Sequence, residues 1–288
     1  MNKKSFLIVL ILLSVTFVSG CTSHGDDFSK KSGNIEKPDN IGSNADSASG
    51  IHGSEIDVLY QVSTIDALLQ GVYDGVLPVA ELETHGDFGI GTFDGLEGEM
   101  LALDGNYYQI KTDGIAYPVS GEMTTPFATV TYFEADDTLR FEEPVNLTEL
   151  EDFLDLNLPS ENLFYAVRVD GNFSYIKARS VPKQEKPYPK LADAVSTQSI
   201  FEFENISGTL VGFRAPEYVK GVNVPGYHLH FITGDRNAGG HVLDLEMENG
   251  DATLDITSAF FMELPTSGDF YDVELGQDLQ ADMEKVEK

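Results

Sequence analysis

Residues 87–119 read DFGIGTFDGLEGEMLALDGNYYQIKTDGIAYPV. Apolar and polar residues alternate along this stretch, and Asp-Gly or Glu-Gly pairs interrupt the alternation at short intervals. Alternation with a period of two is typical of strands that bury one face, and Asp-Gly pairs favour tight hairpin turns. The stretch therefore predicts consecutive antiparallel strands joined by short turns.

The flanking sequence adds further strands and one clear helix. Residues 58–63 (VLYQVS) and 127–135 (FATVTYFEA) are rich in β-branched and aromatic residues, which favours strands. Residues 146–160 (NLTELEDFLDLNLPS) predict a helix that Asn146 or Thr148 caps. We expect its buried face to consist of Leu147, Leu150, Phe153, Leu154 and Leu156.

The remaining segments predict more sheet. Residues 65–73 space their apolar side chains as a helix does, and residues 187–198 indicate a short helix or turn. Residues 199–263 predict several strands that end in a β-meander, and residues 277–288 form a charged, weakly helical tail. The sequence thus predicts an α+β fold dominated by sheet.

We divide the expected fold into two mixed or antiparallel β-rich subdomains with a few helices, residues 53–160 and 161–288. Residues 104–111 (DGNYYQIK) and 170–177 (DGNFSYIK) share an Asp-Gly-Asn-aromatic start and an Ile-Lys end. The shared pattern indicates either two hairpins with the same turn chemistry or an internal duplication, and eight residues do not separate these alternatives.

The composition restricts the class of protein. The 288 residues are 41% hydrophobic, which suffices for a core, and they carry a formal net charge of -30. Binding to nucleic acid requires a basic surface, so the charge argues against a nucleic-acid partner.

The first residues predict export. Residues 1–20 combine two lysines, a short apolar run and small residues, which is typical of a secretory signal. The ending VSGC is similar to a bacterial lipobox, so we expect Cys21, the only cysteine, to become the lipidated first mature residue; a plain secretory signal is the alternative. Residues 21–52 are rich in Ser, Gly, Asp and Asn and predict a disordered tether. The expected location is extracytoplasmic, with the membrane reached only through the lipid.

Residues 226–244, GYHLHFITGDRNAGGHVLD, hold three of the six histidines. His228 and His230 share one face of a strand, and a hairpin through the glycine-containing loop would return His241 beside them. Three neutral imidazoles without a cysteine suit Zn²⁺ with an open fourth position, which is a catalytic arrangement. We expect Asp235 or Asp244 to accept a hydrogen bond from a ligand histidine. A polar sheet face or a pH-sensitive cluster is the alternative.

Beyond the histidines, several longer stretches carry a family resemblance. The segments YQVSTIDALLQGVYDG, GDFGIGTFDGLEGEM, NLFYAVRVDGNFSYIKARSVPKQEKPYP and GTLVGFRAPEY, together with the histidine segment, resemble bacterial α-acetolactate decarboxylase from about Val58 onward. The resemblance implies conversion of (S)-2-acetolactate to (R)-acetoin and CO₂, zinc held by the three histidines, and a homodimer.

The resemblance also implies three catalytic residues. They are Glu99 in the LEGEM motif, Arg179 in the KARSVP motif, and Glu287 in the tail, for which Glu284 is the competing choice. Glu97 and Ala178 depart from the family's usual Asp and Thr, although neither departure removes a catalytic group.

The chemistry of such a site can be stated in outline. Zinc chelated by the substrate ketone and hydroxyl would stabilise an enediolate. Arg179 would hold the carboxylate or the developing oxyanion, and Glu99 or Glu287 would deliver the proton to one face of the enediolate.

Two other functions stay open from the residues alone. These are a three-histidine zinc hydratase or hydrolase, and a tethered lipoprotein that binds a metal or small ligand.

Overall fold

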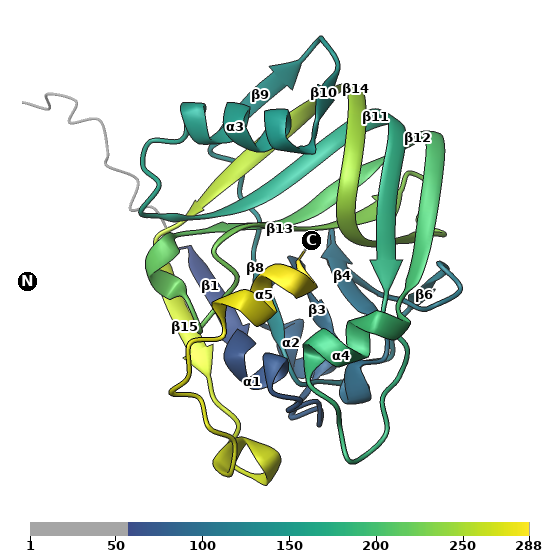
Figure 1. The fold of residues 1–288 in the computed structure, drawn as a ribbon. Coiled ribbons are helices and arrows are strands. Elements are labelled where there is room, and N and C mark those ends of the chain that lie inside the picture. Colours follow the sequence, from purple (N-terminus) through teal and green to yellow (C-terminus); the bar gives the residue numbers. More distant parts are fainter. Residues whose placement is uncertain (1–56, 288) are drawn as a thin grey trace, which may run out of the picture. The chain divides into compact units, whose positions relative to one another are not determined.

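A computed structural model describes residues 57–287 of the chain. The expected signal (1–20), Cys21 and the tether (21–52) lie outside the described residues. Within the described part, two large β-sheets dominate and the helices are few and short, which confirms the sheet-dominated α+β class (Figure 1). No helix in residues 57–287 is both long enough and apolar enough to cross a membrane.

The first sheet has seven strands in the order β15-β1-β8-β3-β4-β5-β6. Their bounds are β1 Val58–Val62, β3 Phe88–Thr92, β4 Glu99–Leu103, β5 Asn106–Ile110, β6 Ala116–Pro118, β8 Ala128–Thr131 and β15 Ala259–Glu263. Neighbouring strands are antiparallel except β15, which runs parallel to β1. The meander of β3 to β6 is the one that residues 87–119 predict. A separate pair joins β2 (Leu77–Pro78) to β7 (Thr124–Thr125).

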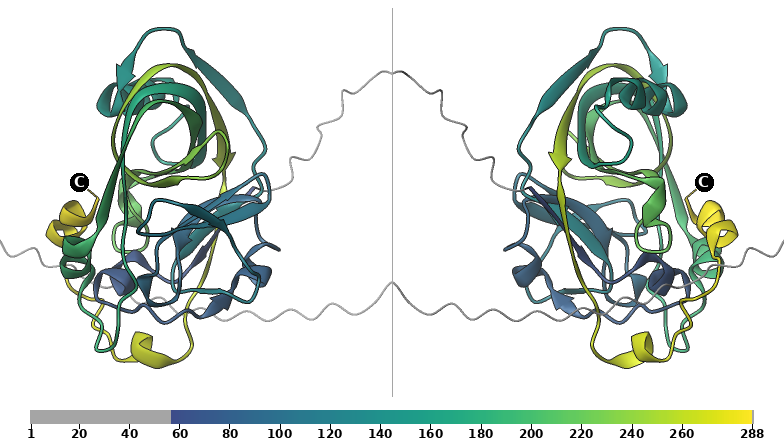
Figure 2. Two further views of the ribbon diagram at one scale, coloured as in Figure 1. Left: turned by 90° about the vertical axis from the view of Figure 1, so that its right-hand side faces the viewer. Right: turned by 90° about the vertical axis from the view of Figure 1, so that its left-hand side faces the viewer.

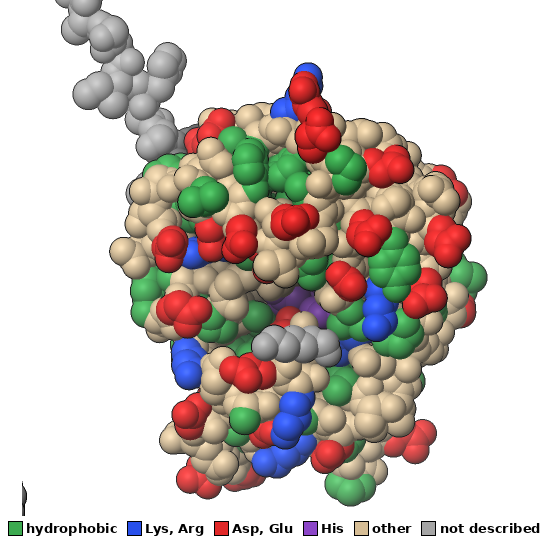
Figure 3. All heavy atoms as spheres, turned by 45° about the horizontal axis from the view of Figure 1, so that its top comes forward, with side chains coloured by type: hydrophobic (Ala, Val, Ile, Leu, Met, Phe, Trp, Pro, Cys, Tyr) green, Lys and Arg blue, Asp and Glu red, His purple; other side chains and the backbone are tan. Residues whose placement is uncertain are grey.

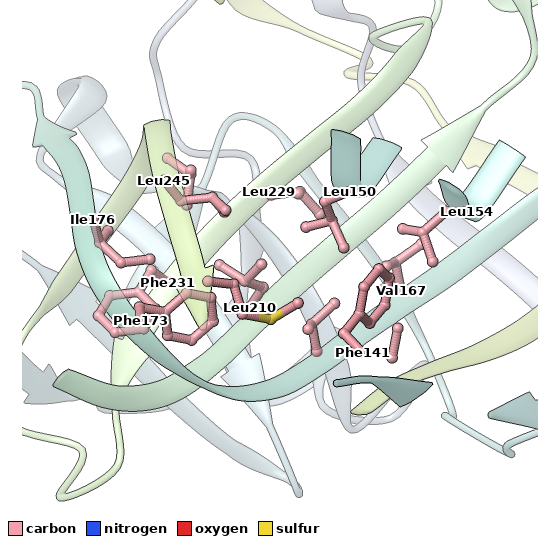
Figure 4. Close-up of a cluster of buried hydrophobic side chains, with 14 of the residues drawn as sticks. Phe141, Leu150, Leu154, Val167, Phe173, Ile176, Leu210, Leu229, Phe231 and Leu245 are labelled. Atoms are coloured by element: carbon pink, nitrogen blue, oxygen red, sulfur yellow. The ribbon is translucent and has the colours of Figure 1, made fainter. Parts of the chain in front are cut away.

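The second sheet has the strand order β10-β14-β11-β12-β13, with β9 paired to β14 and an additional pairing between β13 and β14. Its strands are β9 Asp137–Phe141, β10 Val145–Asn146, β11 Phe164–Ser180, β12 Ser199–Ala215, β13 Gly226–Thr233 and β14 Gly239–Thr257. Figure 2 shows that the long strands curl round on themselves. This curl encloses an apolar core that includes Phe173, Leu210, Phe231 and Leu245 (Figure 4).

A second apolar cluster joins the two sheets. Phe88, Ile90 and Leu101 of the first sheet pack in one cluster with Val211 and Phe213 of β12. The inner face of the first sheet is therefore covered by the second sheet, as in other layered β proteins.

The helices are α1 Ile65–Leu69, α2 Val79–Leu82, α3 Leu147–Asn157, α4 Leu191–Ala194 and α5 Gln280–Val286, with short 3₁₀ turns at η1 Asp94–Leu96, η2 Val195–Thr197, η3 Glu217–Val219 and η4 Gly268–Tyr271. Asn146 caps α3 in a reciprocal capping box with Glu149, as predicted. The predicted buried face of α3 is too wide. Leu150 and Leu154 are buried and Leu147 packs against the same cluster, whereas Leu156 is 84% exposed, because it lies on the opposite side of the helix from Leu154.

Two other sequence predictions, the shared turn and the C-terminal meander, need correction. Asp104 and Gly105 form a hairpin turn with positive φ, but Asp170 and Gly171 lie inside the continuous strand β11, so the two similar segments do not share a turn. Residues 199–263 do form several strands, β12 to β15, but β12 alone is 17 residues long. Residues 239–263 form one long strand followed by β15 in the other sheet, not a meander.

The two sheets do not divide the chain at residue 160. Strands β9 and β10, which precede that residue, pair with β14, and β15 returns to pair with β1. The described residues form one compact unit in which each sheet takes strands from both halves of the sequence.

Candidate metal centre and catalytic site

The β13–β14 hairpin brings the three histidines together. His230 lies opposite His241, and Gly239 and Gly240 pair with Ile232 and Phe231. A Cβ atom on Gly239 would lie 2.1 Å from the Phe231 carbonyl oxygen, so the hairpin requires glycine at that position. The period of two places the imidazoles on one face and Phe231 in the core, as the sequence predicts.

The three imidazoles form a compact group that could hold a metal ion. One ring nitrogen from each of His228, His230 and His241 lies within 4.8 Å of the others, and His228 Nε2 is 3.2 Å from His241 Nδ1. Burial, reinforced by the nearby charge of Arg179, lowers the pKa of His228 to about 3, and burial lowers the pKa values of His230 and His241 well below their usual range. The rings are therefore neutral near pH 7, which is the form that coordinates metal.

The His230 ring is held by a backbone group. Its Nδ1 is 2.8 Å from the Met100 carbonyl oxygen, so Nδ1–H donates there. Its Nε2 is buried and has no hydrogen-bond partner among the described residues. The prediction that Asp235 or Asp244 accepts a hydrogen bond from a ligand histidine is wrong. Asp235 accepts from the Thr233 hydroxyl within its own loop, and Asp244 accepts from the Leu245 amide. A carbonyl from the other sheet fixes the ring instead.

Glu99 enters the site from the start of β4. Gly98, just before it, has φ +78°, and a Cβ there would lie 2.4 Å from the Ile110 carbonyl oxygen, so the sharp turn depends on glycine. Glu99 is buried, and its Oε2 lies 3.8 Å from His230 Nε2. Burial raises the pKa of Glu99 to about 7, against the lowering effect of Arg179.

Arg179 comes from β11, where its backbone lies between His241 of β14 and Ile200 of β12. The side chain is 5% exposed and lines the same cavity as the histidines. Its Nη1 donates to Gln198 Oε1 at 3.2 Å, and its buried Nε has no partner among the described residues. Donors therefore remain for an anion in the cavity.

The tail folds back over the metal centre. Leu279, Met283 and Val286 of the α5 region are buried in a cluster with residues of α1 and α4, and α4 and α5 lie side by side (Figure 1). Glu287 follows α5, and its Oε2 lies 3.7 Å from His241 Nε2. Burial raises the pKa of Glu287 to about 7. Glu284 is exposed and bonds only Gln280 among the described residues, so Glu287 is the tail carboxylate at the site.

These groups surround one small cavity of about 40 Å³. Figure 3 shows histidine side chains at the base of a hollow on this face. The polar lining is Thr92, Glu99, Arg179, Glu287 and the three histidines, and the apolar lining includes Ile65, Leu68, Leu96, Phe127, Val181, Leu191 and Val286. All six residues expected from the sequence meet here.

Two contributors had not been expected from the sequence. The Met100 carbonyl is a backbone group that no residue pattern marks. Gln198 lies in an unremarkable turn, and only its proximity to Arg179 in the fold reveals it. A signal for the ordered tail was present in the sequence, because Leu279, Met283 and Val286 have helical spacing.

The class of protein follows from this arrangement. A sheet-built cavity that brings together three imidazoles able to hold a metal ion, two carboxyls and an arginine is the arrangement expected of an enzyme active site.

Comparisons with known proteins identify the family. Residues 59–277 match the family model of alpha-acetolactate decarboxylase, so the chain belongs to that family of carboxy-lyases. It is 76% identical to the alpha-acetolactate decarboxylase of Methanosarcina mazei over the full length of both chains. It is 45% identical to that of Bacillus licheniformis over 81% of this chain and 92% of the relative.

A solved structure agrees with the fold. The crystal structure of alpha-acetolactate decarboxylase from Bacillus subtilis strain 168 superposes with a TM-score of 0.78 at 43% identity. The superposition covers 80% of this chain and 99% of that chain.

Proposed function

We propose that the chain decarboxylates (S)-2-acetolactate to (R)-acetoin and CO₂ with a zinc ion held by His228, His230 and His241. The observation that carries the proposal is the convergence of these three neutral imidazoles with Glu99, Arg179 and Glu287 on one cavity. Family membership supports the reaction, and the nature of the donors supports the metal.

The residues fit a zinc ion. His230 presents a buried Nε2 without a partner among the described residues, and its other nitrogen is already committed to a carbonyl, which fixes the tautomer. Three nitrogen donors without cysteine leave a position open for substrate. When bound, zinc supplies Lewis acidity toward the ketone and hydroxyl oxygens of the substrate.

Arg179 provides the charge that the substrate carboxylate needs. A guanidinium stays protonated at any physiological pH and offers five donors in a planar fork. With one donor held by Gln198, the rest can bind the carboxylate before CO₂ leaves. The apolar side chains that line the cavity lower the local dielectric, which strengthens this attraction.

Glu99 and Glu287 provide the proton. Each carboxyl has a pKa raised to about 7 by burial, so each can carry a proton near neutral pH. Loss of CO₂ leaves an electron pair on carbon, and a carboxyl on one side of the cavity can protonate only one face of it. We assign this proton to one of these two groups.

The test is product formation from racemic 2-acetolactate by the purified protein. We expect (R)-acetoin and an equal amount of CO₂, loss of the reaction after treatment with a strong chelator, and recovery when zinc is restored. A folded, zinc-loaded protein that forms no acetoin would favour a zinc hydratase, a hydrolase or a binding function.

We also propose that the protein is exported and anchored through Cys21. The support is the sequence of residues 1–21, with its lysines, apolar run and VSGC ending. The full chain should enter the detergent phase of a Triton X-114 separation, and the Cys21→Ala variant should stay in the aqueous phase. Equal partitioning of the two would contradict the anchor.

We propose a homodimer that forms along the edge of the first sheet. β15 is the last strand of that sheet and pairs only with β1 among the described residues. It exposes Phe260 and Phe261, and an unpaired apolar strand edge favours association. Sedimentation should give a dimer for the wild-type protein and a monomer for Phe261→Lys. A wild-type monomer would contradict the proposal.

A further inference from the structure

Gln198 lies beside Arg179 and outside the group of residues assigned above. We propose that Gln198 is a positioning residue: its neutral amide orients the Arg179 guanidinium toward the cavity and leaves the positive charge free for the carboxylate of an anionic substrate. This inference rests on the proposed function for the identity of the substrate. The anion-binding role of Arg179 can be measured independently of turnover.

The backbone fixes where the Gln198 amide lies. Arg179 and Ile200 are paired across β11 and β12, so Gln198 is only two residues from the cross-strand partner of Arg179. Gln198 ends the turn η2, and its N–H donates to the Val195 carbonyl oxygen. Val195 and the adjoining α4 are anchored by the buried cluster that also holds α5. The Gln198 Oε1 acceptor is thus presented from a fixed support.

A second buried arginine, Arg214, differs from Arg179 in the partner of its guanidinium. Arg214 is 6% exposed and forms an ion pair with Asp155 at 3.2 Å, as buried charges ordinarily do. Arg179 is equally buried, yet no carboxylate oxygen in residues 57–287 lies within the 4.0 Å ion-pair distance of its guanidinium. Its side-chain partner among the described residues is the neutral Gln198 amide.

The choice of an amide has a chemical consequence. A carboxylate at position 198 would accept the same hydrogen bond but would neutralise Arg179 and compete with the substrate carboxylate for its donors. An amide accepts the bond through Oε1 and carries no net charge. Gln198 therefore gives orientation without neutralisation, which matters only if Arg179 binds an anion.

The test compares Gln198→Glu with Gln198→Met, which keeps the length but removes the acceptor. Ser196→Glu is the matched control, because Ser196 is exposed on the same turn and receives the same added charge. The ligands are 2-hydroxyisobutyrate, an anion that cannot be decarboxylated in this way, and neutral acetoin. Their dissociation constants come from calorimetry on the zinc-loaded full chain, together with kcat, KM, zinc content and Tm.

We expect Gln198→Glu to weaken binding of 2-hydroxyisobutyrate and to raise KM for the acetolactate substrate, each by about tenfold or more, since an opposite charge now faces Arg179. The dissociation constant of acetoin, the zinc content and the Tm should stay at the wild-type values, and Ser196→Glu should behave as wild type. Gln198→Met should weaken the binding of 2-hydroxyisobutyrate by a smaller factor, because it removes the hydrogen-bond acceptor without adding a charge. If Gln198→Glu does not fold, Gln198→Met alone tests the inference: it should bind 2-hydroxyisobutyrate more weakly than the wild type and bind acetoin equally well.

Two results would overturn the inference. One is unchanged anion binding in both Gln198 variants, and the other is an equal loss for the anion and for acetoin, which a purely structural role would produce. If the wild-type protein binds 2-hydroxyisobutyrate but forms no acetoin, the proposed reaction fails. The dissociation constants of 2-hydroxyisobutyrate for the Gln198 variants then still show whether Gln198 supports anion binding by Arg179.

Discussion

Replacing Glu287 by Gln tests the role of the tail most sharply, because Glu284 provides a control three residues earlier, within α5. The Glu287 side chain is 18% exposed and its Oε2 lies 3.7 Å from His241 Nε2. The exposed Glu284 carboxylate contacts Gln280 at 3.3 Å. Each change replaces a carboxyl group by an amide of nearly the same volume, and the two variants differ in whether the replaced carboxyl lies in the cavity or on the exposed surface.

The expected magnitudes follow from these positions. Glu287→Gln removes a carboxyl from the cavity and should lower kcat by about one hundredfold or more, the usual contribution of a positioned acid or base. Glu284→Gln should leave kcat within about twofold of wild type, since exposed substitutions rarely disturb a distant site. Neither change touches Leu279, Met283 or Val286, so both variants should keep the stability of the fold.

The assay is the initial rate of acetoin formation with matched zinc content, alongside the Tm by calorimetry. A Glu284→Gln variant that loses activity while Glu287→Gln keeps it would refute the assignment of the tail carboxylate. Loss of activity in both variants with a lowered Tm would instead indicate that the tail acts only by packing.

Three further substitutions test the site and the fold. Glu99→Gln should keep zinc and the wild-type Tm but lose about one hundredfold or more in kcat, and acetoin production at the wild-type rate would remove its catalytic role. Arg179→Ala should abolish detectable decarboxylation yet retain zinc; a variant that kept every measured property would favour a metal-binding protein over an enzyme. Leu154→Ala should lower the free energy of unfolding by about 2–5 kcal/mol, as for other buried leucines, whereas Leu156→Ala should change it by less than about 0.5 kcal/mol. Equal losses in urea unfolding would contradict the observed face of α3.

Local patterns in the sequence predicted the elements that local chemistry determines. The alternation and Asp-Gly turns of residues 87–119 gave the β3–β6 meander, and the capping residues of α3 gave its start. The three histidines converge because the period of a strand and a glycine-containing hairpin suffice to bring them together. Both predictions depend on contacts between residues that lie close together in the sequence.

Features that depend on contacts between residues far apart in the sequence could not be predicted from local patterns. The Asp-Gly at 170–171 forms no turn because β12 and β14 pair along both sides of β11 and keep it extended. Glu99 and Arg179 reach the histidines from β4 and β11, so only the family resemblance pointed to them. The Met100 carbonyl and Gln198 contribute through positions in the fold that no residue type indicates.

The measurement that tests the central claim most directly is a zinc titration of the chelated protein. The rate of (R)-acetoin formation is followed as zinc is added, and a His230→Ala variant, which lacks the buried Nε2 donor, is titrated in parallel. We expect the wild-type rate to rise linearly to a break at one zinc per chain and the variant to form no acetoin at that ratio. Full activity before zinc is added, or a saturated wild-type protein without acetoin formation, would contradict the account.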